Sequence, residues 1–160
     1  GWLGHDAPFA MEPDYRPAMT TERLRVGTPP IVQLSILDTA LDVWEGVSME
    51  EIRGASVALC ETFIAEVEAR CPDLTLASPR DADVRGSQVS FAFADGYAVV
   101  QALIDRGVIG DFRAPNIMRF GFTPLYLDQA DVVRAAEILE DVMKSESWKD
   151  PKYQVRSRVT

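Results

Sequence analysis

The fold is decided by residues 87–122, which read SQVSFAFADGYAVVQALIDRGVIGDFRAPNIMRFGF. This stretch begins with alternating polar and apolar residues, as a strand with one buried face does. Asp95 is then expected to cap a helix at 97–106 that ends at Gly107. Beyond it, Ala114-Pro115-Asn116 has the composition of a turn. We therefore expect three strands in this stretch, at 87–94, 108–112 and 117–122.

The segments on either side have the periodicity of helices. Pro30 suits the first turn of a helix over 31–44 that Gly46 ends. Ser48 and Glu51 have capping-box spacing, which predicts a second helix from there to about Ala69. A short strand is expected at 74–77, and Asp128 is expected to cap a last helix ending near Lys144.

The resulting order is helix, helix, strand, strand, helix, strand, strand, helix. It predicts an α/β chain of the α+β kind, with helices packed on one face of a small, mainly antiparallel sheet. Residues 1–29 differ, because Pro8, Pro13, Pro17 and the Pro29-Pro30 pair favour an extended or looped arm. Such an arm is uncommon in a compact domain unless it serves a site or a partner. We therefore expect the chain to be a piece of a longer protein.

Composition excludes several classes of function. The formal net charge is -9, which disfavours binding to nucleic acid or to an anionic membrane surface. The basic stretch 144–158 contains acidic residues too and is expected to be a solvated end. The sequence has no apolar run of membrane-spanning length and no signal-peptide pattern. The single His5 and the widely spaced Cys60 and Cys71 predict no metal site, and reduced thiols suit a cytoplasmic protein.

Four positions are candidates for chemistry. Arg119 lies between Met118 and Phe120 in an expected strand, where its guanidinium must be paired. It could bind a ligand carboxylate or form an internal ion pair. Thr28 precedes an expected helix, where it could cap the helix or contact a phosphate. Arg85-Gly86 could contact an anion or form a turn, and Trp2 lies in the exposed-looking loop GWLGH.

Five segments together resemble the C-terminal half of bacterial kynureninases. In order, they are GWLGH at 1–5, RVGTPPI at 25–31, RGSQVS at 85–90, GVIGDFRAPNIMRFG at 107–121 and TPLY at 123–126. The resemblance runs from Gly1 to about Leu139. It implies a pyridoxal-phosphate (PLP) enzyme of the aspartate-aminotransferase type (fold type I), a cytoplasmic homodimer. Such an enzyme hydrolyses L-kynurenine to anthranilate and L-alanine, in the kynurenine pathway of tryptophan catabolism and NAD biosynthesis.

The resemblance also assigns roles to single residues. Trp2 matches a loop tryptophan that contacts cofactor or substrate, and Thr28 matches a position near the cofactor phosphate. Arg119 matches the arginine that holds the α-carboxylate of the substrate. Leu3 is aromatic in some relatives, which leaves the choice between kynurenine and 3-hydroxykynurenine open, with the bacterial pattern favouring kynurenine. We expect structural roles for His5, Arg85 and Arg113.

The lysine that binds the cofactor lies upstream of the GW loop in the family. The lysines of this chain, Lys144, Lys149 and Lys152, all lie in a charged C-terminal stretch, whereas a Schiff-base lysine needs a fixed, desolvated setting. We therefore expect the chain alone to be inactive, with no catalytic residue of its own. By the same resemblance, residues 1–45 would end the large PLP domain and 46–160 would form the small C-terminal domain.

Two other hypotheses remain open at this point. The chain could belong to another fold-type-I enzyme, such as a cysteine desulfurase, although Cys60 and Cys71 fall in or next to a helix rather than on a mobile loop. It could also be a stand-alone module for ligand binding or dimerisation. Binding of kynurenine without cofactor would favour such a module.

Overall fold

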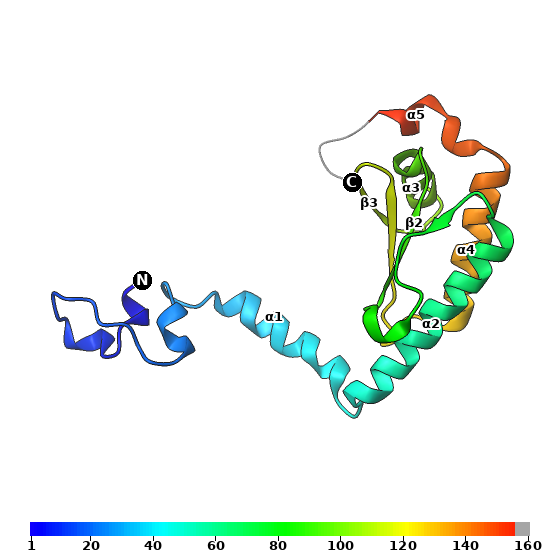
Figure 1. Ribbon diagram of the computed structural model, residues 1–160. Helices are drawn as coiled ribbons and strands as arrows, with labels where there is room; N and C mark the ends of the chain where they lie inside the picture. The colour runs from blue at the N-terminus through cyan, green and yellow to red at the C-terminus, as the bar shows by residue number, and fades with distance from the viewer. Residues whose placement is uncertain (156–160) are drawn as a thin grey trace. The chain divides into compact units, whose positions relative to one another are not determined.

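The computed structural model describes residues 1–155 (Figure 1). The chain forms two compact units, of which the first is Gly1–Glu45 and the second begins at Gly46. Each unit has its own internal contacts. The assignment of the first unit to the end of a larger cofactor domain stays a prediction.

The second unit is built on a four-stranded antiparallel sheet with the strand order β1-β2-β4-β3. The strands are β1 Thr75–Leu76, β2 Gln88–Ala92, β3 Asp111–Arg113 and β4 Ile117–Gly121. Strands β3 and β4 form a hairpin in which Asp111 lies opposite Arg119. The turn between them contains a cis peptide bond at Ala114-Pro115.

Up to residue 155, the sheet is accompanied by four α-helices: α2 Met49–Arg70, α3 Gly96–Ile104, α4 Gln129–Lys144 and α5 Pro151–Gln154. Helices α2 and α4 pack against each other, and α3 contacts β3, β4 and α4. This confirms the prediction of an α+β unit with helices packed on a small antiparallel sheet.

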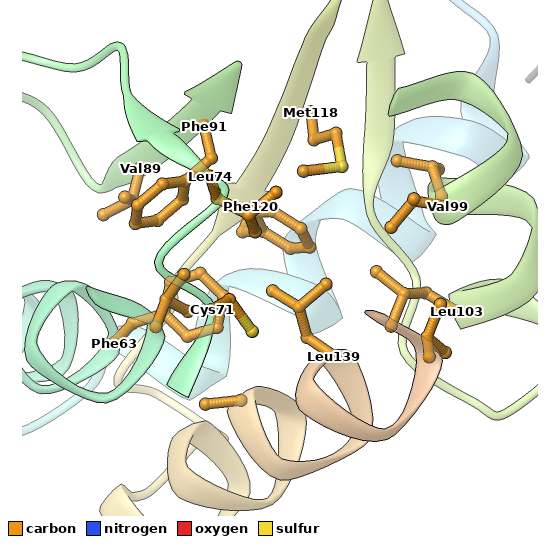
Figure 2. Packing of buried hydrophobic residues seen from close by; sticks show 14 of the residues in the cluster. Phe63, Cys71, Leu74, Val89, Phe91, Val99, Leu103, Met118, Phe120 and Leu139 are labelled. Carbon is orange, nitrogen blue, oxygen red and sulfur yellow. The ribbon is translucent and has the colours of Figure 1, made fainter. Parts of the chain in front are cut away.

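The core of the second unit lies between these helices and the sheet. Figure 2 shows side chains of α2, α3 and α4 meeting those of β2 and β4. Phe63 of α2 is central, because its ring lies 5.0 Å from that of Phe120 and 5.1 Å from that of Phe122, between ring centroids. On β2 and β4 the buried apolar side chains are Val89, Phe91, Met118 and Phe120. Their alternation leaves every second residue of each strand on the opposite face.

Two of the expected helix caps are present. Ser48 and Glu51 form a complete capping box at α2, and Asp128 forms another with Asp131 at α4. Asp95 precedes α3, but its side chain caps no backbone donor, so that expectation was wrong. Gly107 follows α3 with φ of +85°, a conformation that favours glycine.

The first unit contains one α-helix, α1 Ile31–Leu41, followed by a 3₁₀ turn at Asp42–Trp44. Residues upstream of α1 form 3₁₀ turns at Trp2–Gly4, Pro8–Ala10 and Thr21–Leu24. Backbone hydrogen bonds tie this segment together, from Ala18 to Gly4 at 2.9 Å and from Asp6 to Arg16 at 2.8 Å. The expected looped arm is therefore a folded loop with contacts of its own.

Three further details differ from the expectations. Residues 108–110 are not part of a strand, because β3 begins at Asp111. Pro30 is the N-cap of α1 rather than its first helical residue, and α1 buries none of its side chains within the first unit. The spacing of apolar residues predicts α1 correctly, but nothing in the first unit covers its apolar side chains.

The C-terminal stretch is also more ordered than expected. Helix α5 packs against α3, and the ring of Trp148 lies edge-on to Phe93 with centroids 5.6 Å apart. The part of the expected solvated end at 156–158 lies outside the described residues. Within residues 1–155, no helix combines the length and the apolar character needed to cross a bilayer.

Candidate functional site

Arg119 is placed by the alternation of β4. Its neighbours Met118 and Phe120 are buried in the core, so the Arg119 side chain projects from the opposite face of the sheet. The side chain is 29% exposed, which leaves part of the guanidinium accessible. The apolar flanks that make this arginine look buried in the sequence therefore belong to the other face.

Asp111 pairs with Arg119 across the hairpin. Arg119 donates through Nη2 to Oδ2 of Asp111, and Arg113 donates through Nη1 to Oδ1 of the same carboxylate over 2.9 Å. The hydrogen bond from Arg119 lowers the pKa of Asp111, so the carboxylate is ionised at neutral pH. The Arg119 Nε is buried and has no hydrogen-bond partner among the described residues.

The internal ion pair considered for Arg119 is therefore present, and it leaves room for a ligand. A guanidinium carries five N–H donors in a planar fork, and Asp111 engages one terminal nitrogen. A substrate carboxylate and Asp111 could bind the same guanidinium. The two roles considered for Arg119 are thus compatible.

Two more polar residues share this face with Arg119. Ser90 lies opposite Arg119 in the register of β2 and β4, and its Oγ accepts a hydrogen bond from Gln88 Nε2 over 3.3 Å. We call Gln88, Ser90, Asp111, Arg113 and Arg119 the polar face of the sheet. With two arginines and one aspartate it carries a net positive charge in a chain whose formal net charge is -9. Such a face attracts an anionic group.

In the first unit, Trp2 lies in a loop that His5 holds in place. The Ala7 N–H donates to His5 Nδ1 over 2.9 Å, so Nε2 carries the proton and donates to the Asp14 carbonyl over 3.1 Å. His5 is buried and held by these two hydrogen bonds, which fits the structural role expected for it. The Trp2 ring is exposed and meets Phe9 edge-on, with centroids 5.6 Å apart. A hollow of about 450 Å³ lies beside it.

Gly4 shows why this loop contains glycine. A Cβ at that position would lie 2.5 Å from the carbonyl oxygen of Arg23, a contact that no side chain tolerates. The close approach of the two backbones brings Trp2 and the 3₁₀ turn before Thr28 into one folded loop.

Thr28 is exposed two residues before the N-cap of α1. No side chain caps this helix, so the plain capping role considered for Thr28 is not realised. Its hydroxyl lies in the segment that leads into the positive end of a helix dipole, where anions are stabilised. Trp2 and Thr28 belong to the first unit and Arg119 to the second, so neither unit brings all three together.

None of the lysines is suited to bind an aldehyde cofactor. Lys149 pairs with Glu146 over 2.6 Å, Lys152 pairs with Asp105 over 2.9 Å, and Lys144 pairs with Glu140. Hydrogen bonds to Tyr153 and Asp105 raise the pKa of Lys152 above its ordinary range, which keeps the amine protonated. A protonated, exposed amine is a poor nucleophile.

Arg85 has a structural role. Its side chain is 2% exposed, pairs with Glu61 and donates to the carbonyls of Pro79 and Arg80 over 2.9 and 3.1 Å. The turn lies just before Arg85-Gly86, at Ala82–Val84, and the Arg85 backbone itself is extended. The side-chain contacts of Arg85 attach residues 79–85 to α2. Among residues 1–155, no cluster of three or more histidine, cysteine or acidic side chains is arranged to hold a metal ion.

A second hollow, of about 600 Å³, lies between β4 and α4. Its walls are mostly apolar, and the two charged residues at it are already engaged: Asp131 in the α4 capping box and Arg134 with Glu137. We therefore place the candidate site on the polar face rather than there.

Sequence reasoning missed Asp111 as the partner of Arg119. The signal that could have found it is the hairpin itself. A turn centred on Ala114-Pro115-Asn116 places residues 111 and 119 opposite each other, and a residue two positions from 111 on the same strand shares its face.

Comparison with known proteins agrees with the motifs. Residues 52–139 match the family model of the kynureninase C-terminal domain. The chain is 49% identical over 162 aligned positions to the kynureninases of Pseudomonas fluorescens and Burkholderia mallei strain SAVP1. The kynureninase of Burkholderia pseudomallei strain K96243 gives the same identity. Each alignment covers 100% of this chain and 39% of the relative, so the chain spans about two fifths of the length of these relatives.

Proposed function

This chain belongs to the kynureninase C-terminal domain family, and on that premise we propose that it forms the C-terminal part of an enzyme that hydrolyses L-kynurenine to anthranilate and L-alanine. The observation that carries the proposal is the partly exposed guanidinium of Arg119 on a positively charged sheet face. The reaction is a hydrolysis of a carbon–carbon bond next to a ketone.

Arg119 binds the α-carboxylate of the substrate in this proposal. A guanidinium recognises a planar carboxylate by parallel charge-assisted hydrogen bonds, which fix orientation as well as position. Holding the carboxylate fixes the position of the α-carbon and of the side-chain ketone attached through it. Arg119 therefore acts in binding and orientation and carries no proton in the reaction.

The whole enzyme would use pyridoxal phosphate, which supplies an electron sink for the bond cleavage. The accessible ring of Trp2 fits a stacking contact with the cofactor or the substrate, and the exposed hydroxyl of Thr28 fits a contact with the cofactor phosphate. The paired lysines do not fit the role of binding the aldehyde. That residue would come from the part of the protein that this chain does not include.

We therefore expect the isolated chain to be inactive and to form no specific adduct with pyridoxal phosphate. Borohydride treatment followed by peptide mass spectrometry should find only scattered, substoichiometric labelling of the lysines. A stoichiometric adduct on a single lysine would contradict this expectation.

The assembly, location and substrate preference are predictions of the same kind. The family resemblance leads us to expect a cytoplasmic homodimer that prefers L-kynurenine to 3-hydroxykynurenine. Thr28 would then contact the cofactor phosphate from across the dimer interface.

A cysteine desulfurase remains the alternative within the same group of cofactor enzymes. It needs an ionisable thiol on an accessible loop. Cys60 lies within α2 and Cys71 directly follows it, and both are buried. Burial raises the pKa of both thiols, that of Cys71 to about 11, so neither is a ready nucleophile. These features disfavour the desulfurase.

The testing experiment is an assay of the full-length protein with pyridoxal phosphate and L-kynurenine. Anthranilate, which is fluorescent, should be released in step with L-alanine, and 3-hydroxykynurenine should react more slowly. A cofactor-loaded protein that cleaves neither substrate would refute the proposal. Binding of kynurenine to the isolated chain without cofactor would instead favour the stand-alone module.

A further inference from the structure

The backbone that carries Asp111 and Arg119 is held in place by the packing of neighbouring residues in the core. On β3, Phe112 is buried, and on β4 Met118 and Phe120 are buried, so the hairpin cannot rotate about its own axis without exposing apolar surface. Asp111 and Arg119 are direct cross-strand partners on the other face. The Asp111 carboxylate is therefore held on a rigid part of the backbone, and the Arg119 side chain is hydrogen-bonded to it.

Arg119 needs such a fixed point if it is to bind a ligand in one orientation. Arginine has a long side chain with many rotamers, and an unattached guanidinium on a sheet face samples many of them. The bond from Nη2 to Asp111 Oδ2 selects one arrangement before a ligand arrives. Preorganisation of this kind lowers the cost of binding.

The pairing alone would have a disadvantage, because an aspartate cancels the charge that attracts a carboxylate. Arg113 removes this disadvantage. It donates to the other carboxylate oxygen, Oδ1, over 2.9 Å, so the single negative charge is shared between two cations. The cluster retains one net positive charge.

We propose that Asp111 is a positioning residue that orients Arg119 for the substrate carboxylate, and that Arg113 keeps the pair net positive. This inference rests on the proposed function, because it assumes that Arg119 binds that carboxylate. Asp111 need not touch the substrate.

Exposure argues against a merely structural role. The Asp111 side chain is 33% exposed and that of Arg113 is 57% exposed. Ion pairs with this degree of solvent contact contribute little to folding stability. The three residues nevertheless form one connected network on a single face. Substituting Asp111 should therefore affect ligand recognition much more than stability.

The test is steady-state kinetics of the full-length enzyme with pyridoxal phosphate, comparing wild type with Asp111→Asn and Arg113→Gln. Asp111→Asn should raise the KM for L-kynurenine about tenfold, with kcat within about twofold of wild type and Tm unchanged. Arg113→Gln should raise KM by a smaller factor. Asp141→Asn is the matched control, because it removes an aspartate from another arginine–aspartate pair of the second unit, and its KM should not change.

An unchanged KM in Asp111→Asn would overturn the inference. A lowered KM would overturn it too, because Asp111 would then be a competitor of the substrate for Arg119. A rise in KM that is accompanied by a lowered Tm would mean that the role of Asp111 is structural.

A second measurement keeps this inference separate from the proposed function. In the 160-residue chain, the Nε–H resonance of Arg119, assigned by its loss in Arg119→Lys, should be narrow and distinct. In Asp111→Asn its chemical shift should move to the averaged value of freely rotating arginine side chains, and in Asp141→Asn it should stay where it is in wild type. If the resonance is averaged in wild type, Asp111 does not orient Arg119, whatever the enzyme assay shows. If the orientation is confirmed and the wild-type enzyme does not cleave kynurenine, the proposed function fails instead.

Discussion

At the scale of single residues, the environment of a side chain decides whether its chemistry is usable. Arg119 and Arg85 both have apolar or turn-forming neighbours in the sequence, yet one is partly exposed beside a single aspartate and the other has three partners in a buried setting. Only the first leaves part of its guanidinium accessible to a ligand. The difference arises because strand alternation directs Arg119 away from the core.

The two cysteines provide a prediction at this scale. Both are buried, and desolvation raises the pKa of each thiol. We expect neither to react with a thiol-specific reagent such as 5,5′-dithiobis(2-nitrobenzoate) at pH 8 in the folded chain. Both should react at once in denaturant. Rapid stoichiometric labelling of one thiol in the native chain would show that it is accessible and would reopen the desulfurase alternative.

At the scale of elements, helix starts are where local sequence acts most directly. The N-caps of α2 and α4 could be predicted because Ser48 and Asp128 satisfy free backbone donors within four residues. The same reasoning failed at α3. Asp95 has the right residue type, but its side chain accepts no bond from that helix.

This contrast gives a prediction with an internal control. Asp128→Ala should lower the free energy of unfolding by about 1 kcal/mol, because an N-cap side chain is lost. Asp95→Ala should change it by much less. Urea denaturation of both variants measures the difference. Equal losses would show that Asp95 also caps its helix in solution.

The limits of prediction also appear at this scale. The strands at 88–92 and 117–121 could be predicted because alternation is a local signal. The strand order, and with it the partnership of Asp111 and Arg119, depends on pairing between distant segments. Residues 108–110 are apolar enough for a strand, but they lie before the residues that pair in the hairpin. Because a strand forms only where the backbone pairs with a neighbouring strand, these residues remain outside the sheet. The family motifs indicated Arg119, and only the register indicated Asp111.

At the scale of the whole molecule, surface ion pairs make the free energy of unfolding depend on pH. Hydrogen bonds from Lys152 and Lys144 lower the pKa values of Asp105 and Glu140 respectively. A carboxylate with a lowered folded-state pKa stabilises the fold above its unfolded-state pKa, and this contribution is lost as pH falls through the folded-state value. The ordinary pKa values are 3.8 for Asp105 and 4.5 for Glu140.

We therefore expect the free energy of unfolding to be level from pH 7 to about pH 5 and to fall steadily below pH 4. Urea denaturation across that range measures it. Glu140→Gln should flatten part of the decline, because this carboxylate bonds both Arg70 and Lys144. A free energy of unfolding that stays level down to about pH 3 would contradict this expectation.

The central claim is that Arg119 binds the α-carboxylate of kynurenine, and the most direct test is the effect of Arg119→Ala on the full-length enzyme. We expect a large rise in the KM for L-kynurenine, equivalent to about 2–4 kcal/mol for the loss of a charge-assisted pair. The inhibition constant of the kynurenine analogue that lacks the α-carboxylate should stay at its wild-type value. An unchanged KM for L-kynurenine, or an equal loss of affinity for the analogue, would contradict the claim.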